Sequence, residues 1–233
     1  EFTNTSSVST GTFSSLWAFG DNTTSVQSSP VYSYKDPGTY TVKLTTTSNY
    51  GCTDYKEKKV LVHPHPFIYF TTNYSKQCLN SNLFRFNNIS SVNPGKIAKA
   101  IWKFGDGDSS EIFSPQHSYQ SLGKYTVLLK VVTDAGCFDT LSKQMDVLPQ
   151  PEAGMQVSDS AQCFKDNKFQ FTDDSKISSG TITDYYWDFG DGKTDNQKNT
   201  SHVYTSAYSF YVTHIVTSSN GCRDTAAVAI AVH

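Results

Sequence analysis

A segment that recurs at a fixed spacing limits the possible folds of this chain more than any other feature. The three copies read "LWAFGDNTT" around Trp17, "IWKFGDGDS" around Trp102 and "YYWDFGDGKT" around Trp187, and the differences in number are equal, 102 − 17 = 85 and 187 − 102 = 85. A fixed period is typical of chains built from repeated modules. We therefore predict three consecutive units, residues 1–64, 65–149 and 150–233, the first of them truncated at its N-terminus.

Each unit contains short segments in which apolar and polar residues alternate, and none has a helical period. Phe84 and Phe86 alternate with polar neighbours, as strand residues do. Proline-rich stretches, Val62–Phe67 and Leu148–Glu152, separate the units and favour an extended, semi-rigid linker. The pattern predicts an all-β fold of three tandem immunoglobulin-like β-sandwiches joined by short proline-rich linkers.

The five cysteines follow the same period. Cys78 and Cys137 are separated by 137 − 78 = 59 positions, and Cys163 and Cys222 by the same interval, 222 − 163 = 59. We therefore predict the disulfides Cys78–Cys137 and Cys163–Cys222. Cys52 would need a partner at 52 − 59 = −7, so we expect it to be unpaired by truncation of a longer array.

Other uses of the cysteines fit the sequence less well. Zinc sites usually contain close C-x-x-C pairs, which this chain lacks, and no histidine recurs beside these cysteines to activate a thiol. Disulfides form in oxidising compartments. We therefore expect an extracellular or cell-surface location.

The charge distribution excludes some partners. The net charge is −2 and the chain has only two arginines, Arg85 and Arg223, so it lacks the dense positive field that a nucleic acid requires. No apolar run reaches the ~20 residues needed to cross a bilayer. We expect no nucleic-acid partner and no membrane insertion by this segment.

The repeated motifs resemble the PKD (polycystic kidney disease) domain family, whose hallmark is W-x-F-G-D-G followed by H-x-Y and G-x-Y-x-V. The second unit has "WKFGDG", "HSY" and "GKYTV". In the third unit Tyr208 replaces the glycine of the last motif, and in the first unit Asn22 and Tyr32 depart from the pattern. The resemblance covers nearly the whole chain and implies an immunoglobulin-like sandwich that serves outside the cell as a spacer or adhesion module.

The signature residues have expected roles in the core and in a turn. We expect the tryptophans and phenylalanines to be buried and the aspartates to shape the loop by accepting backbone hydrogen bonds. Calcium at Asp106 and Asp191 is the alternative that resemblance to calcium-binding collagenase domains keeps open. We expect no other cofactor and no catalytic residue. The signature residues are Trp17, Phe19, Asp21, Trp102, Phe104, Asp106, Trp187, Phe189 and Asp191.

Several other polar or aromatic residues have a structural and a functional interpretation. His117 and His202 correspond to Tyr32, which favours a structural role over metal binding, and His214 stands at a leucine position of the repeat. Tyr185 and Tyr186 could offer a stacking surface for sugars, but one of the two is expected to continue the strand into the core.

The sequence favours a non-enzymatic function. We expect a repeat segment of a large secreted or cell-surface adhesin that acts as a stiff spacer, and its composition is most similar to that of gliding-motility adhesins of Bacteroidota. The alternative is a set of accessory modules that bind substrate or carbohydrate in a secreted protease or glycosidase. Expected partners are adjacent repeats and a surface polysaccharide or extracellular protein.

Overall fold

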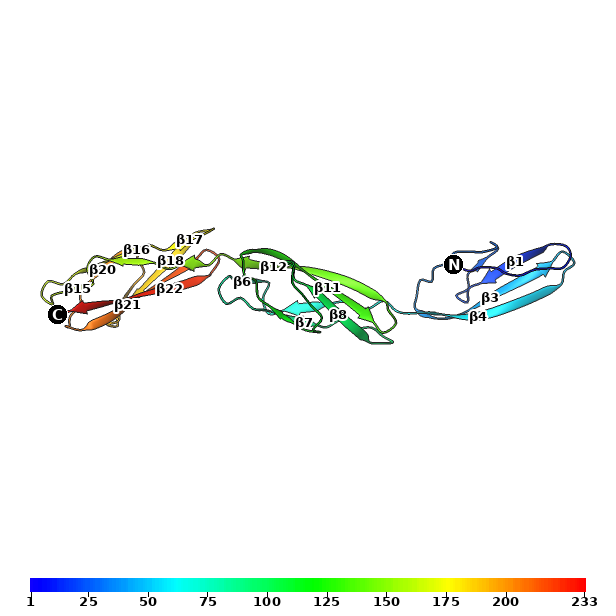
Figure 1. The fold of residues 1–233 in the computed structure, drawn as a ribbon, viewed down its shortest axis with the longest axis horizontal. Helices are drawn as coiled ribbons and strands as arrows, with labels where there is room; N and C mark the ends of the chain where they lie inside the picture. The colour runs from blue at the N-terminus through cyan, green and yellow to red at the C-terminus, as the bar shows by residue number, and fades with distance from the viewer. The chain divides into compact units, whose positions relative to one another are not determined.

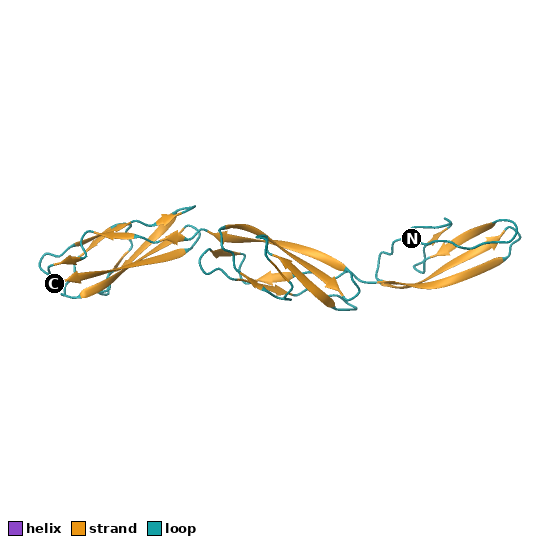
Figure 2. Cartoon of the chain, in the orientation of Figure 1, coloured by secondary structure: helices purple, strands orange, loops and turns teal.

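The computed structural model describes residues 1–233 and consists of strands joined by loops, without any helix (Figures 1 and 2). The all-β prediction is confirmed. By compactness the chain divides into two units, which are Glu1–Tyr69 with Ile89–Ala100 and Lys130–Leu141, and Phe70–Asn88 with Ile101–Leu129 and Ser142–His233. The division crosses strands of the middle repeat, so it does not follow the period of the sequence.

The first repeat forms one antiparallel sheet in the order β2-β1-β3-β4. Its hydrophobic core is small, because Trp17, Phe19 and Val42 are its only buried members. Phe2 lies 5.6 Å from Trp17 and 5.3 Å from Phe19 between ring centroids, so the leading segment covers this face in place of a second sheet. The strands are β1 (Phe13–Ala18), β2 (Thr24–Ser25), β3 (Gly38–Ser48) and β4 (Thr53–Val62).

The second repeat contains two sheets, in the orders β10-β7-β5 and β6-β12-β11-β8-β9. Trp102 and Phe104 are buried, whereas Lys103 between them is exposed, as the alternation of a strand requires. The strands are β5 (Phe70–Thr72), β6 (Lys76–Cys78), β7 (Phe84–Asn88), β8 (Ile97–Lys103), β9 (Ser109–Ser110), β10 (Gln116–His117), β11 (Gly123–Thr133) and β12 (Phe138–Leu148).

The third repeat has the same two sheets, β14-β16-β20 and β15-β22-β21-β18-β19, and a short additional pair, β13-β17. The short strand β15 runs parallel to the end of β22, with Gln162 opposite Val232. The strands are β13 (Pro151–Glu152), β14 (Met155–Val157), β15 (Ala161–Gln162), β16 (Phe169–Asp173), β17 (Lys176–Ile177), β18 (Ile182–Asp188), β19 (Thr194–Asp195), β20 (Thr200–His202), β21 (Ser209–Ser218) and β22 (Arg223–Val232).

Aromatic side chains fill the cores of the second and third repeats. Trp187 is fully buried and lies against Phe171, which also contacts Phe189 at 5.6 Å between ring centroids. Such rings bury a large apolar area each and therefore dominate the free energy of folding of a small sandwich. The buried cluster of the third repeat consists of Phe169, Phe171, Trp187, Phe189, Tyr204, Val212, Ile230 and Val232.

Candidate functional site

The Gly-Asp-Gly loop begins at a position that only glycine can occupy without strain. Gly105 has φ +90°, and a Cβ placed on it would lie 2.8 Å from the carbonyl oxygen of Thr126 on β11. Both the left-handed backbone and the close approach exclude a side chain here. Gly20 and Gly190 have φ values of +86° and +77° and approach the backbone in the same way. The loop is therefore held tightly against the neighbouring strand in all three repeats.

The loop aspartate makes two different hydrogen bonds. Oδ1 of Asp106 accepts from the backbone N–H of Asp108 at 3.1 Å, and Oδ2 lies 2.6 Å from Nε2 of His117. In the third repeat Asp191 accepts from Lys193 N–H at 3.0 Å and lies 2.8 Å from His202. One carboxylate therefore closes the turn and also ties it to the strand that carries the histidine.

The first repeat keeps the same arrangement with a different residue. Tyr32 replaces the histidine, and its hydroxyl donates to Oδ2 of Asp21 at 2.5 Å. The Tyr32 ring stacks on Phe19 with centroids 4.0 Å apart, as the His117 ring stacks on Phe104 at 4.1 Å. The tyrosine and the histidine therefore make the same two contacts, a hydrogen bond to the loop aspartate and a stack on the signature phenylalanine.

A second tyrosine locks the loop to the core. The hydroxyl of Tyr119 donates to the carbonyl oxygen of Phe104 at 2.8 Å, and Tyr204 does the same to Phe189 at 2.9 Å. Burial raises the pKa of both phenols well above the usual value, with a further contribution from the neighbouring Asp106 or Asp191. These tyrosines therefore stay protonated and serve as hydrogen-bond donors.

The environment lowers the pKa of each loop aspartate. Partial burial raises the pKa of Asp106 and of Asp191, but the hydrogen bonds from His117 or His202 and from the backbone favour the carboxylate and prevail. For Asp21 the hydrogen bonds from Thr23 and then from Tyr32 lower the pKa. The carboxylates are thus held in the charged form as fixed acceptors, unlike a catalytic acid, whose pKa is normally raised.

One of the three loops brings together side chains that could bind a metal ion. Asp106, Asp108 and His117 have ligand atoms within 4.8 Å of one another. The positions that correspond to Asp108 hold Thr23 and Lys193 in the other repeats. Calcium needs six to eight oxygen ligands, and this cluster supplies two carboxylates and a nitrogen. Calcium binding at Asp106 and Asp191 remains a prediction.

His214 has a partner that the sequence did not indicate. Its side chain is fully buried, stacks on Trp187 with ring centroids 3.7 Å apart, and places Nε2 3.0 Å from Oδ1 of Asp173. The equivalent residues one period earlier are Leu129 and Asn88, so the pair replaces an apolar residue and an amide. The sequence feature that could have indicated this contact is that both positions change together in the third repeat.

The tyrosines of β18 point in different directions. Tyr186 is exposed, whereas Tyr185 is half-buried and lies parallel to His214 with centroids 6.2 Å apart. A shallow hollow on this part of the third repeat is lined by Tyr185, Tyr186, Asn196, Ile215 and Arg223, among others. It offers an aromatic and a cationic group to a partner.

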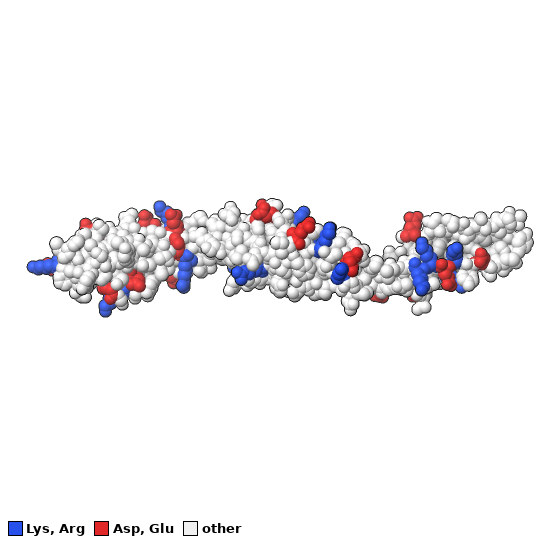
Figure 3. Space-filling model, turned by 60° about the horizontal axis from the view of Figure 1, so that its bottom comes forward, with Lys and Arg blue, Asp and Glu red and all other residues white.

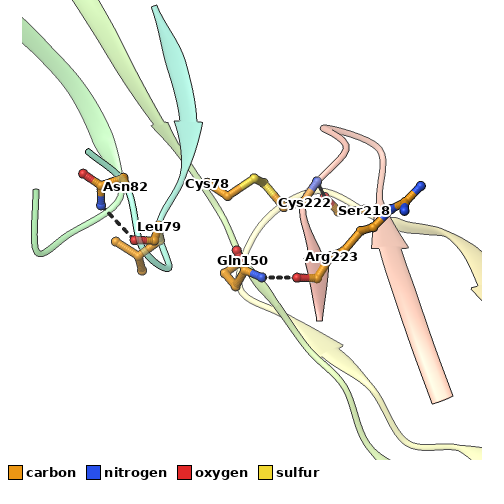
Figure 4. Close-up of a disulfide and its surroundings, with 7 residues drawn as sticks. All are labelled: Cys78, Leu79, Asn82, Gln150, Ser218, Cys222 and Arg223. Carbon is orange, nitrogen blue, oxygen red and sulfur yellow. Dashed lines mark hydrogen bonds between the residues drawn. A yellow bond between two sulfur atoms is a disulfide. The ribbon is translucent and has the colours of Figure 1, made fainter. Parts of the chain in front are cut away.

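The cysteine pairing differs from the prediction. Cys78 forms a disulfide with Cys222, 144 residues away, with a Cα–Cα distance of 5.6 Å (Figure 4). Cys52, Cys137 and Cys163 are free. The predicted disulfides Cys78–Cys137 and Cys163–Cys222 are therefore wrong.

The strand register explains the error. Gln162 lies opposite Val232 at the end of β22, so Cys163 follows at that end, whereas Cys222 directly precedes the first residue of β22. The ten residues of β22 span about 33 Å. A disulfide requires Cα atoms within about 7 Å. In the second repeat Cys78 lies opposite Leu148 and Cys137 precedes Phe138, with β12 between them.

Hydrogen bonds accompany the disulfide where the third repeat begins. Nε2 of Gln150 donates to the carbonyl oxygen of Arg223, next to Cys222 (Figure 4). Oδ2 of Asp224 accepts from the backbone N–H of Ala153 at 2.8 Å. The Gly-Cys turn of the third repeat thus bonds both to the segment that leads into it and to Cys78 of the preceding repeat.

The model for the PKD domain family matches three segments of the chain, residues 1–62, 70–148 and 149–232. The exact boundaries of the three units, residues 1–64, 65–149 and 150–233, stay a prediction. The chain has no helix of the length and apolar character that a membrane crossing requires.

A metalloprotease and two collagenases of bacteria contain segments that are similar to parts of this chain. A pre-pro-metalloprotease, PrtV, of Vibrio cholerae is 31% identical over 144 residues, which are 60% of this chain and 15% of that protein. The collagenase ColA of Bacillus cereus is 43% identical over 51 residues, 22% of this chain and 5% of that protein. A microbial collagenase of Vibrio alginolyticus is 36% identical over 74 residues, 28% of this chain and 9% of that protein.

Among solved structures, the PKD1 domain of the Vibrio cholerae metalloprotease PrtV is 31% identical, covers 36% of this chain and 98% of that domain, and has a TM-score of 0.33. The chain spans only 15% or less of the three curated relatives described above. Because the family match extends over nearly all residues from 1 to 232, the chain belongs to the PKD domain family and carries three consecutive PKD domains.

Proposed function

We propose that the chain is a non-catalytic accessory segment of a larger extracellular protein, in which PKD domains hold a catalytic domain near an insoluble protein substrate. The observation that carries this proposal is the match of PKD domains to nearly every residue, together with relatives that are a metalloprotease and collagenases. Most of the length of those relatives lies outside the matched segments. The catalytic work would belong to such other parts.

One property supports an extracellular setting, and another bears on the kind of partner. The disulfide Cys78–Cys222 favours an oxidising compartment, because reducing compartments keep thiols free. Charged residues make up 17% of the chain, and large areas of the face in Figure 3 carry none. A weakly charged surface of this kind suits contact with a protein or polysaccharide matrix better than binding to a polyanion.

The loop geometry favours a non-catalytic role. The Asp106–His117 pair could be taken for an acid and a base, but Oδ1 of Asp106 also closes the turn. The first repeat replaces the histidine by Tyr32 and keeps the contact. A group that shapes a loop tolerates this exchange, whereas a general base of matched pKa would be lost by it.

The adhesin role expected from the composition has no support among the relatives described above, which are proteases and collagenases. We therefore place the accessory role first. A spacer function is common to both roles, and the disulfide between consecutive repeats favours it because a covalent bond limits their rearrangement.

The hollow at Tyr186 and Arg223 is the surface proposed to contact the substrate. Exposed tyrosine and arginine are the residue types that most often dominate binding energy at protein interfaces. Tyr211, 73% exposed on β21, is a matched tyrosine that does not line this hollow.

The test is co-sedimentation of the purified chain with insoluble collagen fibrils, with chitin as a polysaccharide comparison. We expect retention on collagen, several-fold weaker retention of Tyr186→Ala, and unchanged retention of Tyr211→Ala. Retention on chitin alone would replace the protein substrate by a carbohydrate. If the chain is retained on neither collagen nor chitin, the accessory binding role is overturned. If hydrolysis of collagen or casein survives repurification, the non-catalytic assignment is overturned.

A further inference from the structure

We propose that Cys163 is the anchor for a second disulfide between domains, and that its partner is the Gly-Cys turn of a further PKD domain placed after the third one. Cys163 would accept that turn as Cys78 accepts the turn that holds Cys222. This inference does not depend on the proposed accessory function, because it concerns only how consecutive domains are joined.

The loop that carries Cys163 is built like the loop that carries Cys78. Gln77 bonds to Leu83 in both directions, at 3.0 Å through its Nε2 and at 2.8 Å through its Oε1. Gln162 bonds to Lys168 in the same two directions, at 3.2 Å and 2.7 Å. The residue after each glutamine is the cysteine. The backbone therefore presents the two thiols from equivalent positions.

A buried asparagine fixes both loops from the other side. Asn82 donates to the carbonyl oxygens of Leu79 and Tyr119, both at 2.8 Å. Asn167 donates to those of Phe164 and Tyr204, at 2.8 Å and 3.0 Å. Each asparagine stands at the fourth position after its cysteine, and both are buried. Cys163 thus has the same rigid support as Cys78, but it is exposed and free.

The partner turn is also a repeated structure. The backbone N–H of Cys222 donates to Oγ of Ser218 at 3.2 Å, and Ser218 N–H donates to the carbonyl oxygen of Cys222 at 2.8 Å. Cys137 and Cys52 make the corresponding pair of bonds with Thr133 and Ser48. The turn that is joined to Cys78 therefore exists in every repeat.

The residues around the turn repeat as well. Its sequence is Gly-Cys-x-Asp in each case, "GCTD", "GCFD" and "GCRD", starting at Gly51, Gly136 and Gly221. In the third repeat Asp224 of this motif accepts the N–H of Ala153 in the segment that leads into the domain. The turn thus carries its own contact to the joint besides the thiol.

The observed spacing gives the pairing rule. The 144 residues between Cys78 and Cys222 equal one spacing within a repeat plus one period, 59 + 85 = 144. Applied to Cys163, the rule places its partner at 163 + 144 = 307, which is the position of Cys222 shifted by one period, 222 + 85 = 307. By the same rule, Cys137 and Cys52 would each form a disulfide with a cysteine of the domain that precedes their own.

Formation of this bond needs a two-electron oxidant, for which a small-molecule disulfide such as oxidised glutathione is sufficient. The thiolate of Cys163 attacks it and releases one glutathione thiol, and the thiolate of the incoming turn then attacks the Cys163 sulfur and releases the second. One protein disulfide and two reduced glutathione molecules result, so electrons and protons balance.

The test extends the intact chain by a second copy of residues 149–233 directly after His233, which preserves the period of the repeats. The added copy carries Tyr211→Phe at an exposed position, so that the peptide with its turn cysteine differs in mass from the original Cys222 peptide. The protein is refolded in a glutathione redox buffer, digested without reduction and mapped by mass spectrometry. We expect the peptide of Cys163 linked to the peptide of the added copy of Cys222, in addition to the Cys78–Cys222 peptide. Cys163 should then lose its reactivity toward an alkylating agent almost completely.

Two variants serve as controls. Cys163→Ser in the extended chain should leave the added turn cysteine free and open to alkylation, and Cys137→Ser should leave the new link unchanged. The proposal is overturned if Cys163 stays reduced, or joins any other cysteine, while Cys78–Cys222 forms and tryptophan fluorescence shows that the added domain is folded. Absence of the Cys78–Cys222 link in the folded chain would remove the pairing rule itself.

Discussion

Cys78 and Cys222 form a disulfide although they belong to consecutive PKD domains. Cys137 belongs to the same domain as Cys78, but the two cysteines lie at opposite ends of β12. The disulfide therefore joins two domains and does not cross-link the interior of either one. In the classical immunoglobulin sandwich a disulfide connects the two sheets. Here the aromatic cores are closed without any cysteine bridge between the sheets.

We predict that cysteine reactivity in the oxidised chain falls into three groups. The exposed thiols of Cys52 and Cys163 should react rapidly with iodoacetamide, half-buried Cys137 more slowly, and Cys78 and Cys222 only after reduction. Peptide mapping without reduction should give one linked pair. Linked peptides of Cys78 with Cys137, or of Cys163 with Cys222, would contradict the structure.

The sequence determined much of the fold because strand alternation and the tryptophan period are local or strictly periodic. It could not decide the cysteine pairing, since a separation of 137 − 78 = 59 and one of 222 − 78 = 144 both satisfy the same period. The missing information was the parallel pairing of Cys78 with Leu148 and of Gln162 with Val232. Such contacts between short strands leave almost no trace in composition.

The candidate site was predictable in its residues but not in its geometry. The motif identified Asp106 and His117, and the exchange of histidine for Tyr32 indicated a structural contact. The carboxylate of Asp106 makes its two hydrogen bonds only in one conformation of the loop. The flanking glycines permit that conformation, but they permit others as well, so the sequence does not specify it. Asp173 was missed because its partner, His214, is distant in the sequence.

The loop glycine should be intolerant of substitution. Gly105→Ala is expected to cost about 2–4 kcal/mol of unfolding free energy, because the left-handed conformation and the contact of a Cβ with Thr126 both add strain. Gly107→Ala is the control, since Gly107 also has positive φ, +106°, but nothing within 4 Å of its Cβ position, and about 1 kcal/mol is expected. Urea denaturation followed by tryptophan fluorescence measures both. Equal costs for the two variants would disprove the close approach.

Acid should weaken the middle and third domains through the loop aspartates. The pKa of Asp106 and of Asp191 is lower in the folded state than the ordinary value of about 3.9. Such a group contributes stability that is fully present above the unfolded pKa and is lost as the pH falls through the folded pKa. We therefore expect stability to decline below about pH 4, and Asp106→Asn to make this decline shallower.

The control for this pH dependence is Glu111→Gln, an exposed carboxylate of the same domain. It should leave the acid limb of the stability curve unchanged, as measured by denaturant midpoints between neutral pH and about pH 3. A curve for Asp106→Asn that matches the unsubstituted chain at every pH would show that the carboxylate makes no net contribution.

The buried pair of His214 and Asp173 gives the sharpest test of the third core. His214→Leu removes the group that contacts Oδ1 of Asp173 at 3.0 Å and leaves a buried carboxylate with Lys198 at 3.8 Å and the N–H of Ser175. We expect a loss of about 3 kcal/mol, because removing one partner of a buried pair exposes the desolvation cost of the other.

A second substitution separates the contact from the two residues that make it. Adding Asp173→Asn to His214→Leu recreates the combination of the second repeat, Leu129 with Asn88, and should restore most of the loss. Denaturation of the two single variants and the double variant closes a thermodynamic cycle, in which we expect a coupling of at least about 2 kcal/mol. Strictly additive costs would mean that His214 and Asp173 stabilise the core independently and that their contact contributes nothing.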